Sequence, residues 1–227
     1  MLFPWIGLFE QIKLADIYVH YDDVQYSKGS FTNRVQIWDG KAISWLTVPI
    51  IHGTENINQI VIDDSKNWRR KHLNLLQQSY TKAPFKDDML AIVEDVYAES
   101  HLTICSLSIS SILHISRYFG IKNTQQFRYA SELGISGQSS KRVFDIVDQL
   151  GGTHYITGHG AQHYLEHSLF EQNAIEVKYM DYQKLAYPQL TEEFTPYIST
   201  LDLIANCGKS GISLICSGTK DWKEFVT

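Results

Sequence analysis

The chain has 227 residues, of which 44% are hydrophobic and 20% are charged, a composition typical of a soluble globular protein with a sizeable core. The formal net charge of −5 argues against a nucleic-acid partner. Three widely spaced cysteines form no CxxC pair or zinc-like cluster, and the Met-Leu-Phe-Pro-Trp start carries no basic leader, so we expect a cytoplasmic protein.

The elements predicted in the first half follow from periodicity and turn residues. An early proline with apolar residues at helical spacing predicts the first helix. Asp39-Gly40 predicts a two-residue turn between two strands of a hairpin. Strands are predicted over 16–21, 31–38, 42–50 and 57–63, and helices over 4–15, 64–83, 85–98 and 101–119. The helix over 101–119 carries five serines and two histidines, too polar to span a bilayer, so we expect no membrane span.

In the second half, strands alternate with helices, a pattern typical of parallel pairing. Strands are predicted over 125–133, 153–158 and 175–182, and helices over 139–152, 161–174 and 199–208. We therefore predict one α/β domain over residues 1–227, with a mixed, partly parallel sheet flanked by helices. An N-terminal β-hairpin and a helical insertion near residues 66–119 complete the predicted fold.

Two adjacent acids, Asp22 and Asp23, follow the strand over 16–21. Neighbouring side chains at a strand end point to opposite faces, so a carboxylate dyad is not expected. Ligands gather at strand ends in α/β sheets, which favours a functional role. Aspartate is also a common turn residue, and the plain alternative is a turn.

The hairpin begins with Asn33 and Arg34, after a Lys28-Gly29-Ser30 loop. Arginine can bind carboxylate or phosphate through two parallel hydrogen bonds, although a surface ion pair is its more common fate. Gln25 lies in the same polar stretch. Arg34, Asn33 and Gln25 are therefore candidate substrate-binding residues.

His72 falls on the apolar face of the helix over 64–83. A buried polar group needs a partner, and a carboxylate partner would make this histidine a general base near neutral pH. A structural histidine bonded to a backbone carbonyl is the alternative. With Asp22 or Asp23 as that partner, His72 is a candidate catalytic residue.

The segment "GHGAQHYLEH" places His159, His163 and His167 at four-residue intervals, on one face of the predicted helix. His163, Glu166 and His167 match the H-x-x-E-H pattern of some zinc hydrolases, so zinc is the alternative to a site without metal or cofactor. The Gly158-His159-Gly160 turn, between a strand and that helix, is a candidate anion site, although it lacks a complete phosphate-loop pattern.

Six stretches together resemble the WbqC-like protein family, in the order found in that family. They are "FPWIGLFEQIKLAD", "DDVQYSKGSFTNRVQI", "SWLTVPI", "WRRKHLNLLQQSY", "YITGHGAQHYL" and "STLDLIANCG", and they cover nearly the whole chain. The family pattern does not require His163 and His167, which weakens the zinc interpretation. Family members usually begin with a short strand and a His/Gln-Pro segment before "FPW", so we expect that first strand to be missing upstream of Met1.

The resemblance implies an enzyme of surface-polysaccharide, such as O-antigen, or nucleotide-sugar biosynthesis. Its small-molecule substrate would be an activated amino sugar, such as a nucleotide sugar, or a similar small metabolite, and its reaction an acyl or aminoacyl transfer. Asp202, inside "STLDLIANCG", is a further candidate for substrate binding. A zinc-dependent hydrolase and a non-catalytic ligand-binding protein of the same pathway remain alternatives, and a homo-oligomer is compatible with each.

Overall fold

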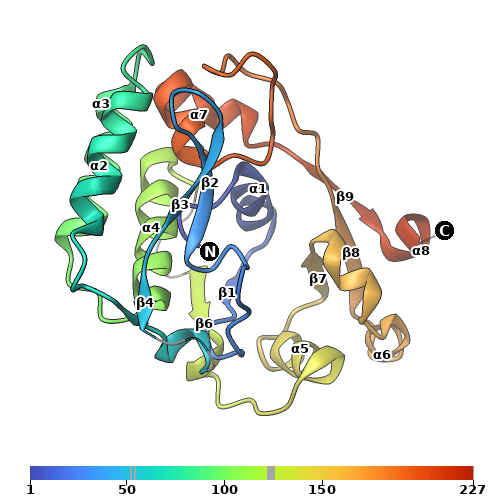
Figure 1. The fold of residues 1–227 in the computed structure, drawn as a ribbon. Coiled ribbons are helices and arrows are strands. Elements are labelled where there is room, and N and C mark those ends of the chain that lie inside the picture. The colour runs from blue at the N-terminus through green and yellow to red at the C-terminus, as the bar shows by residue number, and fades with distance from the viewer. Residues whose placement is uncertain (52, 54, 122–125, 227) are drawn as a thin grey trace.

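The structure is a computed structural model that describes residues 1–51, 53, 55–121 and 126–226. It has the mixed α/β composition that the sequence predicts, with both parallel and antiparallel strand pairs (Figure 1). The α-helices are α1 (Ile6–Leu14), α2 (Trp68–Ser79), α3 (Lys86–Ala98), α4 (Ile104–Phe119), α5 (Ser139–Gln149), α6 (His167–Glu171), α7 (Thr200–Cys207) and α8 (Trp222–Val226).

The strands are short, and each lies close to a turn or a 3₁₀ helix. They are β1 (Tyr18–His20), β2 (Arg34–Trp38), β3 (Ile43–Thr47), β4 (Ile50–Ile51), β5 (Val61–Ile62), β6 (Phe127–Tyr129), β7 (His154–Thr157), β8 (Glu176–Asp181) and β9 (Gly218–Asp221). The 3₁₀ helices are η1 (Ile57–Gln59), η3 (Ala130–Glu132), η4 (His159–His163) and η5 (Gly208–Leu214). Gln125, the first residue of one predicted strand, lies outside the described residues.

The strands form several small sheets instead of the single sheet that the sequence predicts. β1 pairs with β6 in parallel, β7 pairs with β8 in parallel, and β9 joins β8 antiparallel. The pairs β2–β3 and β4–β5 are antiparallel. On β7, the Ile156 carbonyl accepts a hydrogen bond from the Gln11 side chain of α1 (2.9 Å).

The hairpin turn between β2 and β3 is longer than predicted. Trp38 and Ile43 are the last paired residues of the ladder, which leaves a four-residue connection, 39–42, closed by a hydrogen bond from the Asp39 N–H to the Ala42 carbonyl (3.1 Å). The Asp39 carboxylate accepts hydrogen bonds from the backbone N–H groups of Lys41 and Ala42, both at 2.9 Å. This local bonding stabilises the wider loop and lowers the pKa of Asp39.

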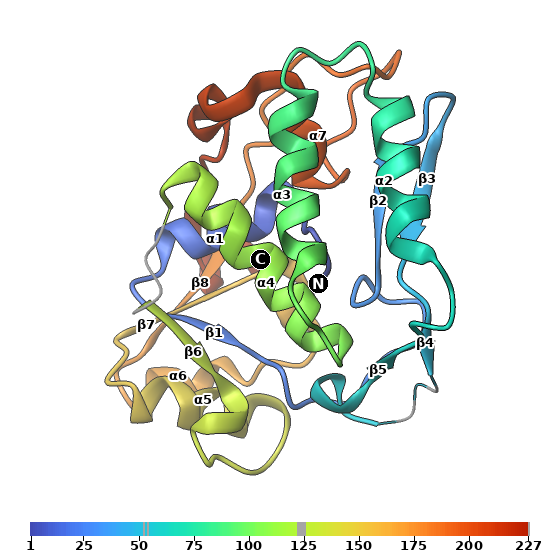
Figure 2. The ribbon, with the colours of Figure 1, turned by 90° about the vertical axis from the view of Figure 1, so that its left-hand side faces the viewer.

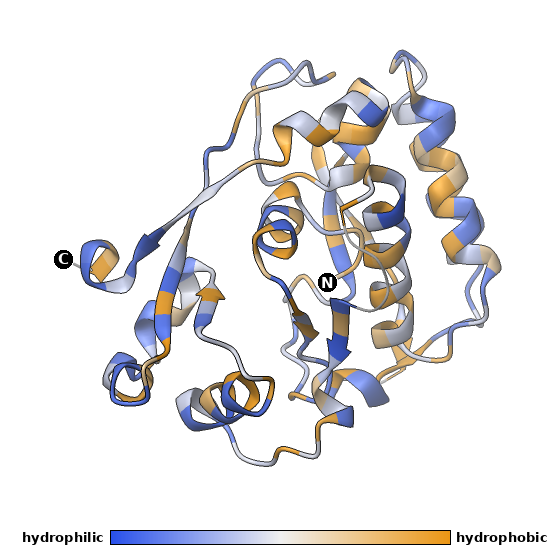
Figure 3. Cartoon of the chain, turned by 180° about the vertical axis from the view of Figure 1, so that it is seen from behind, coloured by the Kyte–Doolittle hydropathy of each residue, from blue (hydrophilic) through white to orange (hydrophobic). Residues whose placement is uncertain are grey.

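The predicted helical insertion is confirmed as the successive helices α2, α3 and α4 (Figure 2). The main apolar core contains side chains from these helices and from α1, α7 and β2, and a smaller cluster lies between β8, α5 and α6. Apolar and hydrophilic residues alternate along the helices (Figure 3), and on α4 and α7 most apolar residues are buried. In the described part of the chain, no helix is both long and apolar enough to cross a bilayer.

The end of α4 depends on a glycine. Gly120 has φ of +64°, and its N–H bonds the carbonyl of Arg117 at 3.2 Å. An L-residue is disfavoured there by its Cβ atom, even though no neighbouring atom lies within 4 Å of a Cβ built on Gly120.

We therefore expect Gly120→Ala to lower the free energy of unfolding by about 1 kcal/mol. Urea unfolding followed by circular dichroism measures this change. Gly218→Ala is the matched control, because no atom lies within 4 Å of its built Cβ and its φ is not positive. Equal stability of the two variants would contradict a conformational role for Gly120.

Candidate functional site

The two predicted acids at the end of β1 bind different parts of the chain. The Asp22 carboxylate accepts hydrogen bonds from the Ser131 backbone N–H (3.0 Å) and from the Ser131 hydroxyl (2.7 Å). Asp23 forms an ion pair with Arg142 (2.5 Å), whose side chain is buried in the structure. The two acids therefore do not form a dyad, and both attach β1 to the segment from η3 to α5.

His72 does not pair with either acid, so the predicted Asp–His contact is wrong. Its Nδ1 lies 2.9 Å from the Tyr97 hydroxyl and its Nε2 lies 3.1 Å from the Thr47 carbonyl. Burial lowers the pKa of His72 to about 4. The helix α2 turns this residue toward β3 and α3, so it acts as a neutral structural histidine.

The predicted residues of the hairpin divide into a buried and a surface group. Asn33 is buried, where it accepts a hydrogen bond from the Tyr26 hydroxyl (2.9 Å) and donates one to the Val48 carbonyl (2.9 Å). Gln25 is exposed and forms an isolated β-bridge with Asn56. The Arg34 guanidinium lies 4.2 Å from the centre of the Trp45 ring.

The histidine-rich segment does not form the single helix that the zinc alternative requires. His163 ends the 3₁₀ helix η4, whereas His167 begins α6, so the two residues do not share one helical face. The His167 ring stacks on Trp222, with centroids 4.4 Å apart, and bonds the Tyr179 hydroxyl. Among the described residues, no group of three or more His, Cys, Asp or Glu side chains is placed to hold a metal ion.

The glycine turn after β7 also differs from the predicted anion site. The His159 Nε2 atom donates a hydrogen bond to the Met180 carbonyl (2.6 Å). The following η4 is only five residues long, so it offers no regular helix N-terminus to an anion. Gly158 instead lies against Tyr182, because a Cβ atom at this glycine would be 3.3 Å from the tyrosine hydroxyl.

A pocket lies between α1 and the chain that follows β8. Its lining is mainly apolar, with one acid and one base: Trp5, Ile6, Gly7, Glu10, Lys184, Leu185, Phe194, Pro196 and Leu214. Because β7 and β8 are parallel, their carboxyl ends lie at the same edge, where α/β proteins often bind ligands. The mixed lining of the pocket is typical of a small-molecule site, but its volume of about 10 Å³ is that of one water molecule, so a larger ligand requires the wall after β8 to move outward.

Glu10 supplies the acid of this pocket. It lies on α1 and is only 3% exposed. Burial raises the pKa of Glu10, and hydrogen bonds from Ser217 and the Cys216 backbone limit the rise. A carboxyl group of this kind is a candidate general base or acid.

The Trp5 indole forms one wall of the pocket and packs against two tyrosines outside its lining. The Trp5 ring centre lies 4.9 Å from that of Tyr182 and 5.5 Å from that of Tyr197. The indole packs directly on Gly7, since a Cβ atom there would lie 2.3 Å from the ring. Gly7 therefore permits the tryptophan to lie flat over the first turn of α1. Burial also raises the pKa of the neighbouring Tyr182 to about 12, so its hydroxyl stays protonated near Glu10.

The opposite wall is an irregular segment, residues 182–198, that connects β8 to α7. Its ends are close, because the Lys184 ammonium donates a hydrogen bond to the Tyr197 hydroxyl (2.8 Å). Lys184 has φ of +50°, a left-handed conformation that is rare for a residue with a Cβ atom. Such strain is common at binding sites, where the surrounding structure holds it in place.

Asp202 does not line this pocket, in contrast to the sequence-based expectation, but it fixes the irregular segment. It is fully buried in the first turn of α7. Its Oδ2 atom accepts hydrogen bonds from the Tyr187 hydroxyl (2.9 Å) and the Gln189 amide (3.0 Å). Gln189 also bonds the backbone N–H and carbonyl of Thr195 (2.9 and 3.1 Å). Asp202 is thus a positioning residue for the pocket wall.

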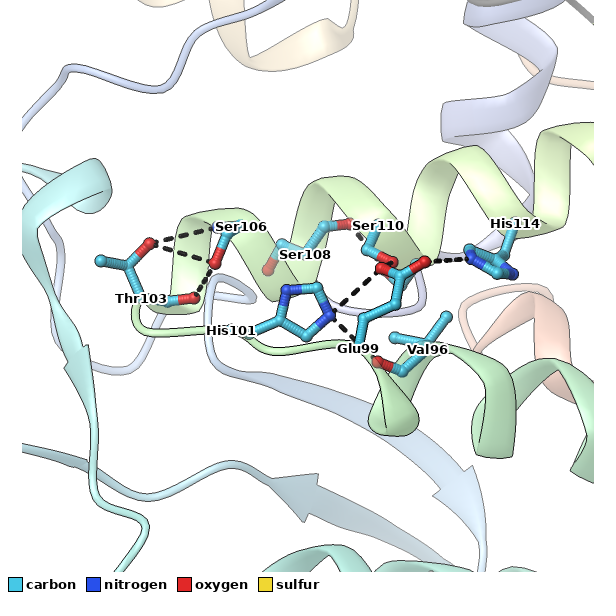
Figure 4. Close-up of polar contacts among 9 residues, drawn as sticks. Val96, Glu99, His101, Thr103, Ser106, Ser108, Ser110 and His114 are labelled. Carbon is cyan, nitrogen blue, oxygen red and sulfur yellow. Dashed lines mark hydrogen bonds and ion pairs between the residues drawn. The ribbon is translucent and has the colours of Figure 1, made fainter.

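A separate polar cluster joins α3 to α4 (Figure 4). The Glu99 carboxylate accepts hydrogen bonds from the Ser110 hydroxyl (2.5 Å) and from His114 Nε2 (2.9 Å), and His101 Nε2 lies 3.4 Å away. These bonds lower the pKa of Glu99. His101 also donates to the Val96 carbonyl (3.0 Å). These polar groups bond one another and hold the end of α3 against α4, which indicates a structural role.

Sequence reasoning missed Glu10 and Lys184. Glu10 lies on a helix that is otherwise apolar on its buried side, between Phe9 and Ile12, and this position was the available signal. Lys184 follows a strand in a segment without periodicity, and no local pattern distinguishes it from an ordinary surface lysine. Both residues line one pocket, because α1 packs against β7 beside the segment that follows β8.

Known proteins match this chain over a region that includes every residue lining the pocket. The model of the WbqC-like protein family matches residues 1–214. The chain is 30% identical, over 210 residues and 90% of each chain, to "Uncharacterized protein Rv1507c" of Mycobacterium tuberculosis. No solved structure matches the chain significantly.

The lowered pKa of His72 predicts a pH dependence of stability. The folded state keeps this ring neutral down to about pH 4, whereas the unfolded chain takes up a proton below its ordinary value of 6.5. The contribution of His72 to the free energy of unfolding is therefore fully present above about pH 6.5 and is lost as the pH falls toward 4. When the pH is lowered from 7 to 5, the free energy of unfolding of His72→Gln, measured in urea, should fall by about 2 kcal/mol less than that of the unmodified protein. The exposed His163→Gln is the control, and an equal loss in all three proteins would contradict this role.

The contacts of Gln189 predict how the pocket wall responds to its removal. Gln189→Leu should lower the free energy of unfolding by about 1–3 kcal/mol, because Asp202 and Thr195 lose buried hydrogen bonds. Chymotrypsin should also cleave faster after Phe194, as measured by mass spectrometry. Gln183→Leu, on the same segment and exposed, should change stability by less than about 0.5 kcal/mol. Unchanged cleavage in the Gln189 variant would show that other contacts hold the wall.

Proposed function

Because the chain belongs to the WbqC-like protein family, we propose that it is a transferase of surface-polysaccharide or nucleotide-sugar biosynthesis. Its acceptor is an activated amino sugar, and the group transferred is an acyl or aminoacyl group. The pocket between α1 and residues 182–198 is the proposed acceptor site. The family resemblance supports the substrate class, and the chemistry of the pocket supports the type of reaction.

The observation that carries the proposal is the buried carboxyl group of Glu10 in an aromatic pocket. An amino sugar has apolar C–H faces that pack on rings such as Trp5, and an amine that bonds a carboxylate. Glu10 is 3% exposed with a raised pKa, which makes it a stronger base than a solvated carboxylate. Lys184, which lines the same pocket, supplies a positive charge for a phosphate or carboxylate of the substrate.

In the proposed reaction the sugar amine attacks the carbonyl carbon of the acyl donor. A new C–N bond forms, and the bond between the acyl carbon and its carrier breaks. Glu10 takes the proton that the amine loses and returns it to the leaving group. The raised pKa suits both steps, because the carboxyl group must bind and release a proton in each cycle.

Glu10→Gln tests this assignment. General acid–base catalysis contributes about 100-fold or more, so kcat should fall by at least about 100-fold with little change in binding. Candidate acceptors are found first by a thermal-shift screen of nucleotide-linked amino sugars with acyl donors, since bound ligand raises the melting temperature. The exposed Glu132→Gln is the matched control.

Two results would contradict parts of the proposal. Full turnover by Glu10→Gln would remove Glu10 from the reaction. Binding of the amino sugar without turnover, with every acyl donor class, would make the protein a ligand-binding member of the pathway instead.

A further inference from the structure

Arg34 carries a charge that the described part of the protein leaves unbalanced. It is half-buried, yet it forms no ion pair with any described residue. Its guanidinium donates a hydrogen bond from Nη2 to the Gly29 carbonyl, and its buried Nε has no partner. A cation that is partly removed from water normally has an anionic partner, so the absence of a carboxylate here needs an explanation.

The loop before the hairpin is shaped around this arginine. Ser30 N–H bonds the Ser27 carbonyl (3.1 Å), which closes a tight turn over residues 27–30. Gly29 has φ of +83°, and a Cβ atom there would lie 3.5 Å from Arg34 Nη2. This backbone conformation lets the Gly29 carbonyl bond the guanidinium. The loop therefore holds one side of Arg34 in place without neutralising its charge.

Exposed aromatic rings lie beside the same guanidinium. Trp45 is 41% exposed and Phe31 is 44% exposed, with ring centres 5.5 Å apart. The Arg34 guanidinium lies 4.2 Å from the centre of the Trp45 ring. Gln36 pairs with Trp45 across the hairpin, which places Trp45 diagonally across from Arg34 on neighbouring strands. The three side chains thus form one surface, which we call the Arg34 platform.

We propose that the Arg34 platform is a binding site for a planar aromatic ring that carries a phosphate, as in a nucleoside monophosphate. The phosphate pairs with the guanidinium, whose planar set of N–H donors matches phosphate oxygens. The ring stacks on the exposed aromatic side chains, in the way that bases stack on protein aromatic residues. This site is distinct from the Glu10 pocket, because none of its three residues lines that pocket.

Titration calorimetry with AMP, CMP, GMP and UMP tests the site. At least one of them should bind with Kd below about 1 mM, whereas inorganic phosphate and the matching nucleoside should each bind about tenfold more weakly. Arg34→Gln and Trp45→Ala should each weaken binding by about tenfold or more. Arg34→Lys should give an intermediate loss, because it keeps the charge and loses the planar donor set.

Controls separate the platform from the rest of the protein. Lys41→Gln removes an exposed charge from the same hairpin and should leave nucleotide binding unchanged. If Trp45→Ala fails to fold, as judged by circular dichroism, Trp45→Phe replaces it and should retain most of the binding. The proposal is overturned if no nucleotide binds at about 5 mM, or if Arg34→Gln binds as well as the unmodified protein. It is also overturned if Glu10→Gln abolishes nucleotide binding while Arg34→Gln does not, since the nucleotide then occupies the pocket.

Discussion

The buried carboxylate of Asp202 determines the shape of the pocket. Residues 182–198 contain no helix or strand, so their polar groups cannot be satisfied by a regular backbone ladder. Tyr187 and Gln189 meet on one oxygen of Asp202, and Gln189 extends this bonding to Thr195. Because Asp202 lies in the core, the wall that carries Lys184 and Phe194 is fixed relative to α1. Asp202 thus anchors the middle of this wall to α7.

Burial has opposite consequences for the titratable groups of this protein. It raises the pKa of Glu10 and lowers the pKa of His72, since each shift favours the neutral form. His72 has both ring nitrogens bonded inside the core, and it has no access to a ligand. Glu10 lines a pocket, and its protonation can therefore respond to a bound molecule. A shifted pKa indicates function only together with such access.

The two parallel strand pairs use their carboxyl ends differently. At the end of β1 and β6, Asp22 accepts a hydrogen bond from Ser131, and Asp23 forms an ion pair with Arg142. Both acids therefore have partners within the chain at this edge. At the end of β7 and β8, bulky rings and the irregular segment leave a pocket that faces α1. Ligand binding at the carboxyl ends of parallel strands would be predicted at both places. Side-chain packing decides which of the two keeps an opening.

Periodicity and turn residues are sufficient to predict the local elements: the helices over the insertion, the hairpin, and the glycine end of α4. They also place His72 on a buried face and separate Asp22 from Asp23, because both depend on the geometry of a single element. Which side chains come into contact depends on how distant elements pack. The partners of His72 come from β3 and α3. Those of Glu10, Cys216 and Ser217, lie directly before β9, far along the chain. Local patterns carry no information on such contacts, since they arise from how separate elements pack.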